Sequence, residues 1–221
     1  MKPNYDLAAT KAMEIIIENG LSETPINPLP ILLNYKGIRV IPFTKMADEV
    51  NKERKDLVPM FYTNQDAATF NLNMPGIDAV QYVVVYNMRL PIEIIHRAIA
   101  RELGHIILGH DGKTRPMEVR MEEAMCFAHH LLTPRPVIRL LQESNMPVTM
   151  NVLTATTGCP DECVDDMQQI PSTNVSKEIN NKVKELFAPH INEYIRFHEH
   201  SPRKDKSQVI DFGTFMDGYE E

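Results

Sequence analysis

The chain has 221 residues, of which 43% are hydrophobic and 24% are charged. These proportions are typical of a soluble globular protein and exclude a collagen, a mostly disordered chain and a small disulfide-stabilised scaffold. The length predicts one sizeable domain with an extension. We place the domain at residues 1–200 and a loose acidic and aromatic tail at residues 201–221.

A cytoplasmic location is expected from two features of the composition. The three cysteines, an odd number, do not make a disulfide framework in a chain of this length. Asp6 and Glu14 interrupt the N-terminal segment where a signal peptide needs an apolar run. No uncharged stretch reaches the length of a membrane helix, so no membrane association is expected.

The formal net charge of −7 disfavours general binding to nucleic acid. Residues 153–164 have the spacing of a helix-turn-helix, which keeps a DNA-binding regulator open as an alternative. The second helix of that motif would carry carboxylates that phosphates repel, at Asp161, Glu162, Asp165 and Asp166. We therefore expect this segment to pack against other helices.

The first half of the chain predicts two helices and a small sheet. Apolar residues recur at helical spacing over 5–19 until Gly20, and a shorter helix is expected at 29–35. A charged loop or short helix is expected at 44–60, and a turn at 73–76. Runs rich in β-branched and aromatic residues predict four short strands, at 38–43, 61–63, 67–72 and 82–87.

The pattern changes from strands to helices at Pro91. An apolar stripe at helical spacing continues to Gly109, and a further helix is predicted at 118–132, ended by Pro134. A helix, a small sheet and then helices are typical of an α+β domain rather than of alternating βαβ units.

The most informative segment lies on the first of these later helices, at Arg101-Glu102-Leu103-Gly104-His105. Many zinc hydrolases place H-E-x-x-H on a helix, because two histidines four residues apart lie about 40° apart on one face and converge on one metal. The glutamate between them acts as general base towards the metal-bound water. Here Glu102 and His105 are present, and Arg101 stands where the first histidine would be.

A second motif follows at Glu123-Ala124-Met125-Cys126-Phe127-Ala128, with Leu131-Leu132-Thr133-Pro134 after it. With Glu102-Leu103-Gly104-His105-Ile106-Ile107-Leu108-Gly109-His110, this resembles the ImmA/IrrE family of metallopeptidases, which pair HELGHxxLGH with a later EANxFAxxLLxP. The resemblance covers about residues 5–170. It implies an α+β, zincin-like metallopeptidase domain, in which a short twisted sheet packs against the active-site helix and additional helices follow.

The same resemblance implies roles for individual residues. His105 and Glu123 would be zinc ligands, and Glu102 the general base. Arg101 departs from the pattern, because a guanidinium has no lone pair for a cation. Its charge would also repel Zn²⁺ by about 4 kcal/mol per unit charge at an effective dielectric near 20. Two ligands are left where catalytic zinc usually has three.

The sequence offers several candidate substitutes for the missing ligand. His96 lies about 180° around the helix from His105 and about 13 Å along it, too far to share a metal. His110 and Cys126 are weak candidates. His110 is better explained as a residue that supports another ligand or as a surface residue, and Cys126 as a small buried apolar residue. We expect His129 and His130 to lie on the helix surface.

Three functions follow as expectations. The first is a regulatory or binding protein with a degenerate metal site, in a phage or mobile-element context, whose partner is a protein such as a transcriptional repressor. The second is an active zinc endopeptidase that cleaves such a protein with a substitute ligand, and the third is a DNA-binding regulator. The cofactor is Zn²⁺ if the protein is active and none otherwise. On the first reading, Arg101 would take the place of the metal and form a salt bridge with Glu123.

Overall fold

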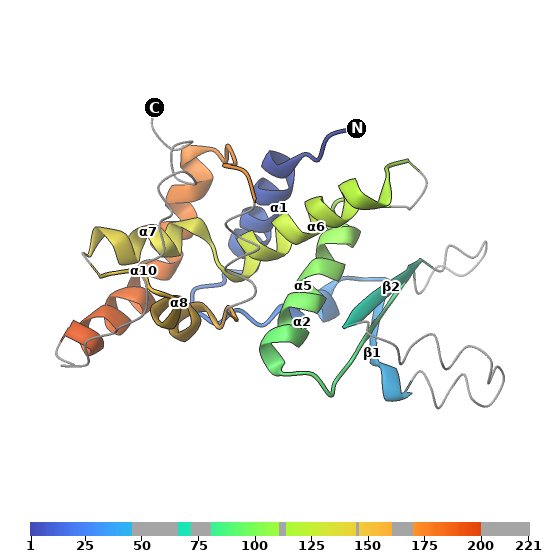
Figure 1. Cartoon of the computed structure of the whole chain (residues 1–221), viewed down its shortest axis with the longest axis horizontal. Helices are drawn as coiled ribbons and strands as arrows, with labels where there is room; N and C mark the ends of the chain where they lie inside the picture. The colour runs from blue at the N-terminus through green and yellow to red at the C-terminus, as the bar shows by residue number, and fades with distance from the viewer. Residues whose placement is uncertain (46–65, 72–80, 111–113, 145, 161–169, 200–221) are drawn as a thin grey trace.

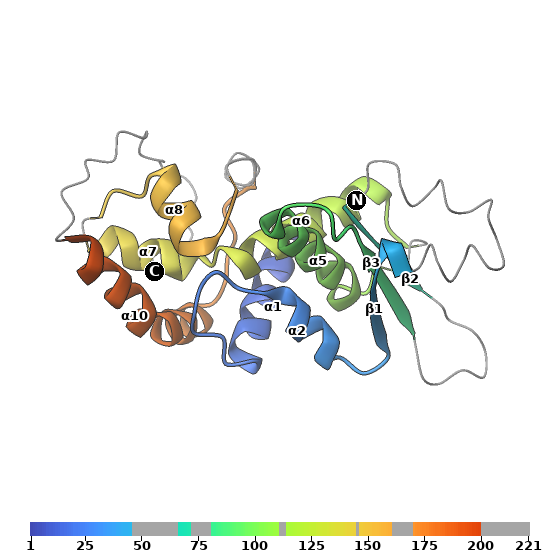
Figure 2. The same ribbon diagram turned by 90° about the horizontal axis from the view of Figure 1, so that it is seen from below.

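Figure 1 presents a computed structural model of the chain, which describes residues 1–45, 66–71, 81–110, 114–144, 146–160 and 170–199. A small sheet lies at one end of the molecule, and helices fill the middle and the other end (Figures 1 and 2). In chain order, the elements are α1 (Tyr5–Glu18), α2 (Pro28–Asn34), β1 (Ile38–Pro42), β2 (Ala67–Asn71), β3 (Tyr82–Tyr86), α5 (Ile92–Ile107), α6 (Met117–Leu132), α7 (Arg135–Glu143), α8 (Met150–Thr157) and α10 (Lys177–Glu199).

The predicted helices and strands within these ranges are confirmed to within one or two residues, and the fold is α+β as predicted. Pro91, where the pattern changes from strands to helices, is the N-cap of α5. The predicted strand at 61–63, the turn at 73–76, most of the segment 44–60, the tail at 201–221 and the second half of the helix-turn-helix pattern lie outside the described residues.

The three described strands form one mixed sheet in the order β1-β3-β2. β1 runs parallel to β3, with Ile38 opposite Tyr82, and β2 runs antiparallel to β3, with Ala67 opposite Tyr86. The side chains of Val84 and Val85 on the central strand are fully buried, because Val84 packs into the main core and Val85 into a second cluster with Ile41 and Phe43. This order leaves β2 at the edge of the sheet nearest the second motif helix, α6 (Figure 1).

Helix α5 lies between the sheet and α6, and α6 in turn packs against α1. The buried face of α5 carries Ile95, Ile99 and Leu103, and it meets Phe127 and Leu131 of α6 in the main core. Burying apolar surface between these elements fixes α5 between β2 and α6. The polar residues of both motifs are therefore held on rigid helices, between the edge strand and α6.

Gly104 allows the two motif helices to approach closely. A Cβ at this position would lie 3.0 Å from Cδ1 of Phe127 and 3.1 Å from the carbonyl oxygen of Ala124. Since a backbone oxygen cannot move without shifting α6, any side chain here pushes the helices apart.

We expect Gly104→Ala to destabilise the protein by about 1–3 kcal/mol, the usual cost of overpacking a core. Helix propensity alone would give the opposite sign, a gain of about 1 kcal/mol for alanine over glycine inside a helix. Urea unfolding of the two proteins distinguishes the cases. A stabilised variant would show that the interface between α5 and α6 accommodates the alanine methyl group.

Candidate functional site

Arg101 of α5 faces the edge strand β2. Its Nη1 and Nη2 donate to Oδ2 and Oδ1 of Asp66 at 3.0 and 2.8 Å, which makes a bidentate ion pair. Nη2 and Nε also donate to Oε1 of Glu102, at 2.8 and 3.1 Å, and Nη2 reaches the carbonyl oxygen of Ala67 at 3.3 Å. The guanidinium thus ties α5 to the residue that precedes β2.

The expected salt bridge between Arg101 and Glu123 is wrong. Arg101 pairs with Asp66 and Glu102, and Glu123 pairs with a different cation, Arg115. The physical reason is that the planar guanidinium finds two carboxylates on the β2 side of α5, where it can bond to both in one orientation.

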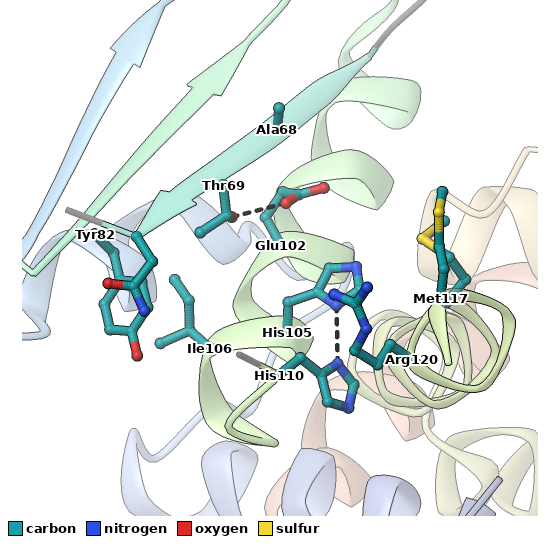
Figure 3. Close-up of a pocket in the computed structure, with 11 residues that line it drawn as sticks. Ala68, Thr69, Tyr82, Glu102, His105, Ile106, His110, Met117 and Arg120 are labelled. Carbon is teal, nitrogen blue, oxygen red and sulfur yellow. Dashed lines mark hydrogen bonds between the residues drawn. The ribbon is translucent and has the colours of Figure 1, made fainter. Parts of the chain in front are cut away.

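Glu102 is 4% exposed and both of its oxygens are occupied. Oε1 accepts from Arg101, and Oε2 accepts from the hydroxyl of Thr69 on β2 at 2.7 Å (Figure 3). Burial by itself would raise the pKa of the neighbouring Asp66, but the hydrogen bonds and charge of Arg101 outweigh it and lower that pKa. The two carboxylates and the arginine form one charged cluster.

Glu123 of α6 is 1% exposed and is held by three donors. The backbone N–H of Asn4 donates to Oε1 at 2.7 Å, His110 Nε2 lies 3.0 Å from Oε2, and Nη1 of Arg115 lies 2.6 Å from each oxygen. Burial favours the protonated form, yet these hydrogen bonds outweigh it and lower the pKa of Glu123. Glu123 is therefore a carboxylate in the folded protein.

His110 lies between His105 and Glu123. The chain leaves α5 through Gly109, whose φ of +66° turns it back, and His110 Nδ1 then lies 2.8 Å from His105 Nδ1. Since the Glu123 carboxylate can only accept, His110 donates through Nε2 and accepts at Nδ1 from the Nδ1–H of His105. The Nε2 of His105 is left with a lone pair.

Both imidazoles are neutral at ordinary pH. Burial, the neighbouring His110 and the charges of Arg101 and Arg120 lower the pKa of His105 to about 3. Burial also lowers the pKa of His110, although Glu123 acts in the opposite direction. The hydrogen-bonded series itself requires a neutral His110, since a proton on its Nδ1 would face the Nδ1–H of His105.

These residues do not fit a zinc ion. His105, His110 and Glu123 form a hydrogen-bonded series in which the imidazole of His110 lies between His105 and the Glu123 carboxylate. A metal needs donor atoms that converge on one point instead. Both oxygens of Glu123 already pair with Arg115. Across the described ranges, no group of three or more histidine, cysteine or acidic side chains is arranged to hold a metal.

A cavity of about 310 Å³ opens between β2, α5 and α6 (Figure 3). Glu102, His105 and His110 line it together with residues of the edge strand and α6. The remaining lining residues are Ala68, Thr69, Asn71, Tyr82, Ile106, Met117, Arg120 and Met121. The cavity therefore brings Glu102, His105 and His110 to one space beside the edge strand.

The other candidate residues lie elsewhere. Sγ of Cys126 is 3.6 Å from the carbonyl oxygen of Tyr5 and from Nδ1 of His130, and burial raises its pKa to about 12. His96 lines a separate small cavity with His129.

The predicted surface positions of His129 and His130 are wrong. They are 5% and 4% exposed, because α6 is packed between α1 and α5 and its last turn is enclosed. His130 Nε2 lies 3.1 Å from the hydroxyl of Thr173, so the C-terminal part of the chain covers it.

Sequence reasoning missed Asp66, Thr69, Arg115 and Arg120 as members of the site. Asp66 precedes β2 and Arg115 precedes the N-cap of α6, and both meet the site through tertiary packing alone. Arg120 carried a usable signal, because it lies three residues before Glu123 and residues at that spacing share a helix face.

Among the described helices, none has both the length and the hydropathy needed to cross a bilayer.

Comparison with protein-family models matches residues 35–153, more than half of the 221 residues, to the IrrE N-terminal-like domain of peptidase family M78. Comparisons with curated proteins and with solved structures find no match. The matched region contains the sheet, α5 and α6, and with them both motifs. The chain therefore belongs to the ImmA/IrrE family of metallopeptidases.

Proposed function

We propose that this chain is a regulatory binding protein of the ImmA/IrrE family whose metal site has been replaced by arginine–carboxylate pairs. The observation that carries the proposal is the position of Arg101, which lies where a zinc-binding histidine would be and bonds to Asp66 and Glu102. A metal in a zincin organises carboxylates and histidines around one positive centre. Here guanidinium groups supply the positive charge.

The chemistry of Glu102 also supports a binding role. A general base must have an oxygen free to take a proton from water. Both oxygens of Glu102 are engaged, one by Arg101 and one by Thr69. With Arg101 and Thr69 bound to its two oxygens, Glu102 is better suited to holding the strand–helix junction than to proton transfer.

The class of partner comes from the family resemblance. We take it to be a protein, in a phage or mobile-element setting, with a transcriptional repressor as the specific case. The cavity beside the edge strand is the surface on which such a partner would bind. The net charge of −7 does not favour DNA as the partner.

The zinc content of the purified protein tests this proposal. After expression in zinc-supplemented medium, elemental analysis should find clearly less than one zinc per chain, because Arg101 removes a ligand and Arg115 occupies Glu123. Stoichiometric zinc that is lost in His105→Ala would overturn the proposal. Lys182→Ala, on an exposed face of α10, serves as the control variant.

A second candidate function is an active zinc endopeptidase with His110 as the substitute ligand. One observation favours it: His110 reaches both His105 and Glu123, the two ligands that the family pattern implies. A metal would have to break both hydrogen bonds and displace Arg115 before the three donors could converge. If this candidate is correct, zinc content is stoichiometric in the wild type and falls in His110→Ala.

A further inference from the structure

Among the residues that the structure describes, the cavity beside β2 is lined by one cationic side chain that no carboxylate neutralises by contact. Arg101 pairs with Asp66 and Glu102, and Arg115 pairs with Glu123. Arg120 donates through Nε to the carbonyl oxygen of Arg115 at 3.2 Å. Within the described part of the chain, its Nη1 and Nη2 have no hydrogen-bond partner, and the side chain lines the cavity beside His105 (Figure 3).

The bond to the Arg115 carbonyl fixes the direction of Arg120. With Nε anchored on the residue that precedes the N-cap of α6, the planar head group has one edge held and the other edge available among the described residues. A guanidinium held in this way is pre-organised for a planar acceptor, since two N–H groups can donate to two oxygens at once. The carboxylate group has that geometry.

The charge around the cavity favours a monoanion. The hydrogen bonds to His105 and Glu123 keep His110 neutral, and the Glu102 carboxylate lines the same space. One free positive charge matches a carboxylate, whereas a phosphate carries about −1.5 to −2 at neutral pH and would meet the negative charge of Glu102.

The rest of the cavity indicates what the carboxylate is attached to. Ile106, Met117 and Met121 give it an apolar wall, and Met side chains adapt to ligands of irregular shape. The Nε2 lone pair of His105 is an acceptor for an N–H of the ligand. An apolar peptide segment offers a backbone N–H for His105 and an apolar surface for this wall. Its C-terminus or an acidic side chain offers the carboxylate for Arg120.

The geometry points to the cavity between β2, α5 and α6 as a binding site for a carboxylate-bearing apolar peptide segment, with Arg120 as the residue that recognises the carboxylate. This inference rests on the proposed binding function and adds the chemistry of the ligand. Removal of the Arg120 charge is expected to abolish discrimination between charged and neutral ligands, because a hydrogen-bonded charge pair sets that discrimination.

Three fluorescein-labelled hexapeptides of one apolar sequence test the inference by fluorescence polarisation. The first has a free C-terminal carboxylate, the second a C-terminal amide, and the third an amide with one central aspartate. The wild type should bind at least one of the two charged peptides about tenfold more tightly than the neutral one. The charged peptide that binds identifies the source of the carboxylate.

Arg120→Gln should lose this preference, and Arg89→Gln, which removes an exposed arginine outside the cavity lining, should keep it. Thermal unfolding of Arg120→Gln checks that the fold is intact. A wild type without preference, or a folded Arg120→Gln with the wild-type preference, would overturn the inference. Zinc measured in the same preparations separates the two proposals: zinc-free protein without preference contradicts only this inference, while stoichiometric zinc contradicts the proposed function.

Discussion

Arg101→Ala is expected to lower the free energy of unfolding by about 3 kcal/mol or more, the usual cost of removing one partner from a buried ion pair. The Arg101 side chain is 13% exposed, and the Glu102 side chain that it neutralises is 5% exposed. Without the guanidinium, Glu102 and Asp66 would be left as neighbouring carboxylates on the two sides of the α5–β2 junction. For a chain of this size, the melting temperature should fall by about 6–12 °C.

Lys182→Ala is the matched control, since it removes one cation from an exposed pair with Glu178 on α10. Exposed pairs of this kind contribute little, so its melting temperature should equal that of the wild type. The measurement is thermal and urea unfolding of the three proteins at neutral pH. An Arg101→Ala variant as stable as the control would contradict the role of Arg101 as the cation of the site.

Acid should destabilise the protein steeply, because His129 and His130 are buried as neutral imidazoles. Burial, aided by the charges of Arg97 and Arg135 respectively, lowers the pKa of each to about 3 from an ordinary value of 6.5. The unfolded chain takes up these two protons below pH 6.5 and the folded protein does not. The stabilisation is therefore complete above pH 6.5 and is lost as the pH falls towards 3.

The expected size is about 1.4 kcal/mol per pH unit for each histidine, or about 3 kcal/mol per unit for both. His129→Leu tests it, because Nε2 of His129 has no hydrogen-bond partner among the described residues and leucine suits an apolar position. At pH 5 this variant should be about 2 kcal/mol more stable than the wild type, measured relative to their difference at pH 8.

The control for the acid experiment is His198→Leu, which replaces an exposed histidine near the end of α10. Its stability should depend on pH as that of the wild type does. Chemical unfolding from pH 8 to pH 5 gives the comparison. Parallel curves for His129→Leu and the wild type would show that His129 is charged in the folded protein.

The sequence predicted what depends on local patterns. The apolar stripe that predicted α5 ends at Gly109, where the backbone takes a positive φ. A glycine at the end of such a stripe is a helix-ending signal that can be recognised in the sequence. The strands of the sheet were visible as β-branched runs, and the two motifs placed Glu102, His105 and Glu123 correctly on α5 and α6.

What the sequence could not predict depends on long-range packing. Arg101 has a long side chain that can reach either side of α5, and only the position of Asp66 beside β2 decides which carboxylates it meets. The burial of His129 and His130 depends on α1 and on the segment around Thr173, both distant along the chain. The return of His110 towards Glu123 likewise depends on how close α5 and α6 lie, which Gly104 sets.

Calorimetric titration of zinc into the wild type and into Arg101→His tests the central claim most directly. The claim is that arginine pairs occupy the place of a metal, so the wild type should show no saturable binding in the micromolar range. Arg101→His adds a ligand on the correct face of α5 and removes a positive charge, and its zinc affinity should rise at least about tenfold. Tight, saturable, one-to-one binding by the wild type would contradict the claim.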